Sequence, residues 1–208
     1  MGNLPPSANR LAKQLFGDTF GQVSRYVDIL VGKGIDRGII GPREADRIWE
    51  RHILNSVAVA DLIETGASVI DVGSGAGLPG IPLAILRPDL RMTLLEPLLR
   101  RSTFLVETVE DLDLSERVSV VRARAEDHSK TYDVVVARAV APLDRLIVWC
   151  DPLRRPDGTL LALKGQSAEL EVEKAQRVLR QRRLAEELVR ASLGDYLEAV
   201  SVVRVTDA

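Results

Sequence analysis

Short β-branched runs alternate with helix-forming stretches from residue 66 onward, and this alternation constrains the fold more than any other feature of the sequence. The strand-like runs cover residues 68–72, 91–95, 117–121, 132–136 and 158–163. The helical patterns between them cover residues 81–87, 98–112, 143–149 and 168–180. Each helical stretch is long enough to cross one face of a parallel sheet. The order therefore predicts an α/β fold with a doubly wound, Rossmann-like sheet.

The two ends of the chain depart from this pattern. Apolar residues recur at helical spacing from residue 5 to about residue 64, which predicts an N-terminal helical extension. We expect this extension at residues 1–65 and a Rossmann-like domain at residues 66–208. Near the C-terminus, strand-like runs at 187–192 and 197–205 are separated by Gly194-Asp195, a hairpin turn signal. A mostly parallel seven-stranded sheet that closes with an antiparallel hairpin is the expected architecture.

Composition limits the function classes. The 208 residues carry a net charge of −2, so a nucleic-acid partner would have to meet a local basic patch. No apolar run approaches the roughly 20 residues that span a bilayer, and residues 1–14 hold no apolar signal core. The single cysteine, Cys150, lies in an apolar helical stretch and is expected to be buried. His52 and His128 have no visible partners for a metal. We expect a cytoplasmic protein without a metal.

A glycine-rich loop follows the first predicted strand directly. Residues 71–80 read Asp-Val-Gly-Ser-Gly-Ala-Gly-Leu-Pro-Gly, and glycines at this place let the backbone turn tightly and approach a ligand. Gly75 to Gly80 fit the G-x-G-x-x-G dinucleotide fingerprint, with Glu96 about twenty residues further on. Counted from Asp71, the same run is Asp-x-Gly-x-Gly-x-Gly, which is similar to motif I of class I S-adenosylmethionine methyltransferases.

The carboxylate of Asp71 favours the second interpretation. A pyrophosphate is negatively charged and would be repelled, whereas the sulfonium and ammonium of S-adenosylmethionine are attracted, directly or through water and the loop. We predict S-adenosylmethionine at Asp71, Gly73 and Gly75, with a nicotinamide-dependent oxidoreductase as the alternative. Glu96 ends the second strand, where a carboxylate can accept both ribose hydroxyls. A solvated acid is the other interpretation of Glu96.

Two basic residues end later strands beside the expected ligand. Arg138 interrupts an apolar run, and it would orient the cofactor or donate a hydrogen bond to the substrate. The alternative is a structural ion pair with a helix carboxylate. Lys164 would meet a phosphate or another part of the substrate, or else be a surface lysine before a turn. His52, on an apolar helical face, is more simply a satisfied core residue than a catalytic one.

Several segments, in order along nearly the whole chain, resemble one family. The segments are Arg51-His52-Ile53-Leu54-Asn55-Ser56, Leu78-Pro79-Gly80-Ile81-Pro82-Leu83, Arg100-Arg101 with Phe104-Leu105, Ala137-Arg138-Ala139 and Leu163-Lys164-Gly165. They resemble RsmG, also called GidB, which methylates N7 of guanine 527 in 16S ribosomal RNA. Many members carry Asp where this chain has Asn55. The resemblance implies cofactor contacts at Gly73, Leu78, Ala125, Glu126 and Arg138.

The chemistry that the resemblance implies needs no general base, because N7 of neutral guanine already holds a lone pair. Alignment and electrostatics suffice. The chain has no Asn/Asp-Pro-Pro-Tyr run of the kind used for exocyclic amines. We expect a monomer that acts on 16S ribosomal RNA or the small ribosomal subunit, with RNA contacts at Arg100, Arg101 and Lys164. Arg122 and Arg124 could also grip phosphates. A non-enzymatic RNA-binding module and a small-molecule methyltransferase remain alternatives.

Overall fold

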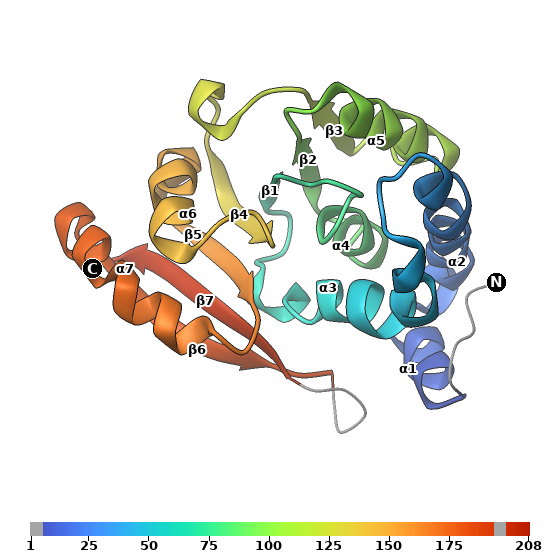
Figure 1. The fold of residues 1–208 in the computed structure, drawn as a ribbon, viewed down its shortest axis with the longest axis horizontal. Coiled ribbons are helices and arrows are strands. Elements are labelled where there is room, and N and C mark those ends of the chain that lie inside the picture. The colour runs from blue at the N-terminus through green and yellow to red at the C-terminus, as the bar shows by residue number, and fades with distance from the viewer. Residues whose placement is uncertain (1–5, 194–198) are drawn as a thin grey trace.

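A computed structural model describes residues 6–193 and 199–208, and a seven-stranded sheet forms its centre (Figure 1). The strands are β1 Ser68–Val72, β2 Arg91–Leu95, β3 Val118–Val121, β4 Tyr132–Arg138, β5 Arg154–Lys164, β6 Leu184–Ala191 and β7 Val200–Asp207. Their order across the sheet is β3-β2-β1-β4-β5-β7-β6. The first five pair in parallel, and β7 pairs antiparallel to β5 and β6. The predicted fold class is confirmed.

Helices cover both faces of the sheet. They are α4 Gly80–Leu86, α5 Leu99–Asp111, α6 Leu143–Cys150 and α7 Ala168–Arg182. Successive residues of a strand point to opposite faces, so Val69 joins the hydrophobic cluster under α4 and α5, whereas Ile70 joins the cluster under α6 and α7. Cys150 belongs to the second cluster and is fully buried, as predicted.

The N-terminal extension is helical, as its apolar spacing predicts. It contains α1 Pro6–Phe16, α2 Phe20–Ile29, a 3-10 helix at Pro42–Arg47, π-helical turns at Ile48–Leu54 and the short α3 Asn55–Val57. Val27 and Ile53 are buried in the same hydrophobic cluster as α4 and α5. The extension therefore packs beside these helices over one face of the sheet (Figure 1). None of the described helices is long and apolar enough to cross a membrane.

The C-terminal hairpin begins earlier than its sequence pattern indicates. Strand β6 starts at Leu184, because Arg183 takes a left-handed φ of 57° and reverses the chain after α7. Strand β7 pairs with it from Val200 to Asp207. The turn predicted at Gly194-Asp195 lies outside the described residues.

Candidate functional site

The site lies at the carboxyl edge of the sheet, where the chain leaves neighbouring strands in opposite directions. After β1 it enters α4 on one face, and after the adjacent β4 it enters α6 on the other. Such a switch point opens a crevice between the two loops, and ligands of open α/β sheets bind there. The glycine-rich loop follows β1 directly and Arg138 ends β4, so both lie at this edge of the sheet.

Glycine is required in the loop after β1. Gly73 has a φ of +70°, and a Cβ added there would lie 2.7 Å from Cγ2 of Val140. Gly77 has a φ of +99°, and its added Cβ would overlap the side chain of Ile81. A side chain at either position would be strained, and one at Gly73 would also clash with Val140, which lines the crevice. The loop is also supported from the extension, because the buried Tyr26 donates its hydroxyl to the Ala76 carbonyl at 2.8 Å.

Asp71 lies beneath this loop and is fully buried. Its Oδ2 accepts hydrogen bonds from the Ser74 hydroxyl at 2.7 Å and from the Gly80 N–H at 3.0 Å. Its Oδ1 is buried without a partner in the described chain. Burial raises the pKa of the Asp71 carboxyl to about 6, so the group is ionised at neutral pH with one free acceptor oxygen. An orphaned carboxylate oxygen of this kind suits a cationic ligand nearby.

Glu96 is 2% exposed, which excludes the solvated-acid interpretation. Its Oε2 accepts the Gly75 N–H at 3.0 Å, and its Oε1 accepts the Leu98 N–H at 3.0 Å. The carboxylate thus joins the glycine-rich loop to the segment after β2. Each oxygen keeps a lone pair that could accept a further hydrogen bond, for example from a hydroxyl group of a ligand.

A small pocket opens over the carboxyl ends of β1, β2 and β3, with a volume of about 120 Å³. Its lining is mostly apolar and consists of Val72, Gly73, Leu95, Pro97, Ala123, Arg124, Ala125, Glu126, Val140 and Trp149. The structure thus brings together Gly73, Ala125 and Glu126 from the predicted cofactor site. Sequence reasoning misses Val140 and Trp149, because each has the pattern of an ordinary core residue of a strand end or a helix.

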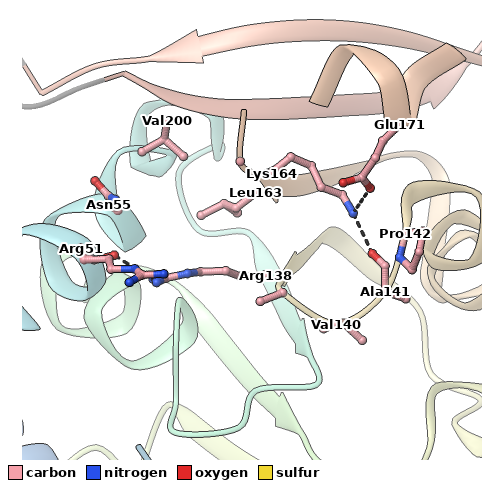
Figure 2. Close-up of a pocket in the computed structure, with 12 residues that line it drawn as sticks. Arg51, Asn55, Arg138, Val140, Ala141, Pro142, Leu163, Lys164, Glu171 and Val200 are labelled. Carbon is pink, nitrogen blue, oxygen red and sulfur yellow. Dashed lines mark hydrogen bonds and ion pairs between the residues drawn. The ribbon is translucent and has the colours of Figure 1, made fainter. Parts of the chain in front are cut away.

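A larger pocket of about 470 Å³ lies next to the first over the ends of β4 and β5, and Val140 lines both (Figure 2). Arg51 and Asn55 reach it from the extension, and Arg138 and Lys164 from the strand ends. Leu163, Val200 and the loop at 139–142 supply apolar walls. The pocket is therefore polar on two sides and shaped by both the extension and the sheet.

Arg138 enters the larger pocket, and its guanidinium is held by the extension (Figure 2). Nη1 donates to the His52 carbonyl at 3.3 Å and to the Ser56 hydroxyl at 3.2 Å. Nη2 donates to the Arg51 carbonyl at 3.0 Å and contacts His52 Nδ1 at 2.9 Å. Across residues 6–193 and 199–208, Arg138 forms no ion pair, so the expected alternative of a helix carboxylate is wrong. His52 is a satisfied, partly buried residue, as predicted.

Lys164 is not the surface lysine of the alternative interpretation, since its side chain is only 8% exposed. Its ammonium pairs with Glu171 Oε2 at 2.8 Å and donates to the Ala141 carbonyl at 2.7 Å (Figure 2). Glu171, in the first turn of α7, also accepts the Leu143 N–H at 2.9 Å. Sequence reasoning does not join Lys164 to Glu171, because the local pattern does not show how α7 folds back over the strand end.

Six predicted contacts line neither pocket: Asp71, Gly75 and Glu96, which lie in or beneath the glycine-rich loop, and Leu78, Arg100 and Arg101. Leu78 packs against the hydrophobic cluster below α4. Arg100 is exposed and donates to the Gly38 carbonyl at 3.3 Å, and Arg101 has a buried Nε without a partner in the described chain. Within the same described ranges, no three His, Cys, Asp or Glu side chains gather as a metal site.

Comparisons with known proteins agree with this geometry. The family model described as rRNA small subunit methyltransferase G matches residues 20–197. A protein of that name from Thermobifida fusca is 55% identical over 198 residues, covering 94% of this chain and 83% of its own. One from Mycolicibacterium gilvum is 54% identical over 180 residues, covering 84% and 77%. Among solved structures, P. horikoshii TYW2 in complex with MeSAdo has a TM-score of 0.60 at 16% identity, covering 76% of this chain and 63% of its own. That likeness shows the methyltransferase fold.

Proposed function

Because the chain belongs to the rRNA small subunit methyltransferase G family, we propose that it transfers a methyl group from S-adenosylmethionine to N7 of a guanine in 16S ribosomal RNA. The observation that carries the cofactor assignment is that two carboxylates accept hydrogen bonds from backbone N–H groups of the glycine-rich loop. Asp71 takes the Gly80 N–H, and Glu96 takes the Gly75 N–H. In a dinucleotide site, N–H groups of this kind would bind the pyrophosphate instead.

The volume and apolar lining of the small pocket support its assignment to the adenine ring of the cofactor. Ala125 and Glu126 line it together with the apolar Leu95, Pro97 and Trp149, as a purine ring requires. Glu96, beneath the loop at the end of β2, would accept the ribose hydroxyls with its remaining lone pairs. The free Oδ1 of Asp71 supplies negative potential to the positively charged methionine end. The nicotinamide alternative is disfavoured, since it would bring a diphosphate to the same two carboxylates.

The larger pocket is the proposed place of the target guanine, because Val140 separates it from the cofactor pocket by a single side chain. When bound, S-adenosylmethionine supplies the methyl group to the N7 lone pair, and no proton has to leave first. The methylated guanine gains a positive charge. Glu171 neutralises Lys164 at 2.8 Å, which reduces the repulsion that a free ammonium would exert on this product. Arg138 would hold the base or the cofactor in line.

We propose further that the enzyme is a cytoplasmic monomer that takes 16S ribosomal RNA, or the small subunit that contains it, as its substrate. Arg100 and Arg101 would contact the RNA outside the two pockets, since neither forms an ion pair in the described ranges. Contacts of exposed arginines with phosphates give salt-dependent binding. Binding should therefore weaken in the double variant R100A/R101A, and the slope of affinity against salt should become shallower.

The decisive experiment compares small-subunit RNA from cells with and without this chain and maps N7-methylguanine by cleavage at the modified base. Loss of one modified guanine, restored by the wild-type gene but not by a Gly73→Ala variant, is the expected result. RNA binding without transfer from labelled S-adenosylmethionine would favour the non-enzymatic alternative. Tight NADH binding without S-adenosylmethionine binding would favour the oxidoreductase.

A further inference from the structure

All the hydrogen-bond partners of Arg138 lie in one short segment of the extension, residues 51–56. Both terminal nitrogens of the guanidinium are engaged there by two carbonyls, a hydroxyl and an imidazole. The Nε–H has no partner in the described chain and is not among its buried unsatisfied atoms. It is the one N–H of Arg138 left for a ligand in the larger pocket.

The imidazole of His52 fixes the direction of this network. An arginine has only donors, so Nδ1 of His52 must accept from Arg138, and the ring proton must sit on Nε2. Nε2 then donates to Oε2 of Glu44 at 2.6 Å. Burial, together with the charge of Arg138, lowers the pKa of His52, which favours the neutral ring that this arrangement needs. The same hydrogen bond lowers the pKa of Glu44 and keeps it ionised.

The carboxylate of Glu44 thus acts on the guanidinium of Arg138 only through the imidazole of His52. A carboxylate bound directly to Arg138 would take two of its N–H groups and neutralise its charge. An imidazole takes one N–H and leaves the charge in the pocket. Glu44 orients the ring, and the ring orients the guanidinium. This order resembles the way in which a carboxylate sets the tautomer and orientation of a histidine in other active sites.

We propose that Glu44 and His52 are positioning residues for methyl transfer, which hold Arg138 at the angle that the reaction requires. The inference rests on the proposed function and extends it, because it makes the N-terminal extension part of the active site. The two residues contact Arg138 or each other, and they need not touch the substrate.

Two substitutions of His52 distinguish the role of Nδ1, which contacts Arg138, from the role of Nε2, which contacts Glu44. Asn places its side-chain oxygen near the position of Nδ1, so His52→Asn keeps the acceptor for Arg138. Gln reaches the position of Nε2 and lacks that acceptor. At saturating S-adenosylmethionine and RNA, we expect His52→Gln to lower kcat more than tenfold, and His52→Asn, which loses only the link to Glu44, to lower kcat about three- to tenfold. KM for both substrates should change less than kcat.

Glu44 gives a second test with less risk to folding, since its side chain is 28% exposed. Glu44→Ala should lower kcat about three- to tenfold, and Glu44→Gln, which can still accept from Nε2, should restore most of it. Glu107→Ala is the matched control, because it removes an ion pair of 2.6 Å between α5 and Arg37 of the extension without involving Arg138. Its kcat should equal that of wild type.

The outcomes are distinguishable. Wild-type kcat in both His52→Gln and Glu44→Ala would overturn the positioning role and leave the proposed function intact. Equal losses in His52→Asn and His52→Gln would overturn it too, because the Nδ1 acceptor would then not matter. Wild-type protein that transfers no methyl group to small-subunit RNA would refute both the proposed function and the inference that rests on it.

Discussion

Replacing Asp71 by Asn should stabilise the protein at alkaline pH while weakening its cofactor site. The carboxyl is fully buried, and its pKa is raised from 3.8 to about 6. At about 1.36 kcal/mol per pH unit, this difference corresponds to about 3 kcal/mol by which ionisation destabilises the folded state. The Asn side-chain oxygen can still accept the hydrogen bonds from Ser74 and Gly80. The NH₂ group, however, takes the buried position of Oδ1, which has no hydrogen-bond partner in the described chain. That unsatisfied donor reduces the net gain to about 1 to 2 kcal/mol at pH 8.

The direction of the pH dependence follows from the raised pKa. Below pH 3.8 the carboxyl is protonated in both the folded and the unfolded state, so it contributes no ionisation penalty. Between pH 3.8 and about 6 the unfolded chain ionises while the buried carboxyl stays protonated, so the folded state loses stability; above about pH 6 the penalty is constant. The amide introduced by Asp71→Asn cannot ionise. The free energy of unfolding of this variant, minus that of wild type, should therefore grow by about 2 to 2.5 kcal/mol between pH 4 and pH 7.

Urea unfolding of the cofactor-free protein at several pH values measures this difference. Asp89→Asn is the matched control, because hydrogen bonds from Arg87 and Gly66 lower the pKa of Asp89. The stability that Asp89 contributes is present above its unfolded pKa of 3.8 and is lost only as the pH falls below that value, so the difference between Asp89→Asn and wild type should stay nearly constant from pH 4 to pH 7. A flat difference between wild type and Asp71→Asn from pH 4 to pH 7 would refute the account of Asp71. Calorimetry should show weaker S-adenosylmethionine binding by the same variant.

Three further predictions concern the cofactor site and the core. Glu96→Ala should weaken S-adenosylmethionine binding by about 1.5 to 3 kcal/mol, ten- to a hundredfold, and unchanged affinity in calorimetry would remove Glu96 from the site. Gly73→Ala should abolish that binding, because its φ is +70° and its Cβ would lie 2.7 Å from Val140; Gly32→Ala, with open space around it, should bind normally. Cys150 should resist iodoacetamide at pH 8 until urea unfolds the chain, because burial raises the pKa of its thiol to about 12, and rapid labelling of folded protein would contradict its burial.

Much of the fold follows from local patterns in the sequence. The strands predicted at 68–72 and 91–95 match β1 and β2, because each is an apolar β-branched run bounded by turn or charged residues. The pattern predicts β5 too short, from residue 158, since Pro156 and Gly158 conceal its first pairing at Arg154. The local pattern does not predict element boundaries that depend on pairing with another strand or on a residue with left-handed φ such as Arg183.

The candidate site was predictable only where a residue acts through the backbone or through its place at a strand end. Gly73 and Glu96 are of this kind. The partners of Arg138 and Lys164 were not predictable, because they depend on how separate segments pack together. Arg138 meets the carbonyl of His52, which is 86 residues away, and Lys164 meets Glu171 only through the path of α7. Such pairs depend on tertiary packing, and periodicity carries no information about them.

The dependence of the extension on β4 has a consequence for synthesis. Residues 6–57 leave the ribosome before β4, yet the guanidinium that binds the carbonyls of Arg51 and His52 belongs to Arg138 of β4. At about 5 to 20 residues per second, the extension waits roughly 4 to 16 seconds for that strand to emerge. Val27 and Ile53 pack in the core shared with α4 and α5, and they lack these partners until both helices have emerged. A pause in translation before the end of α5 would prolong the exposure of these apolar side chains to water.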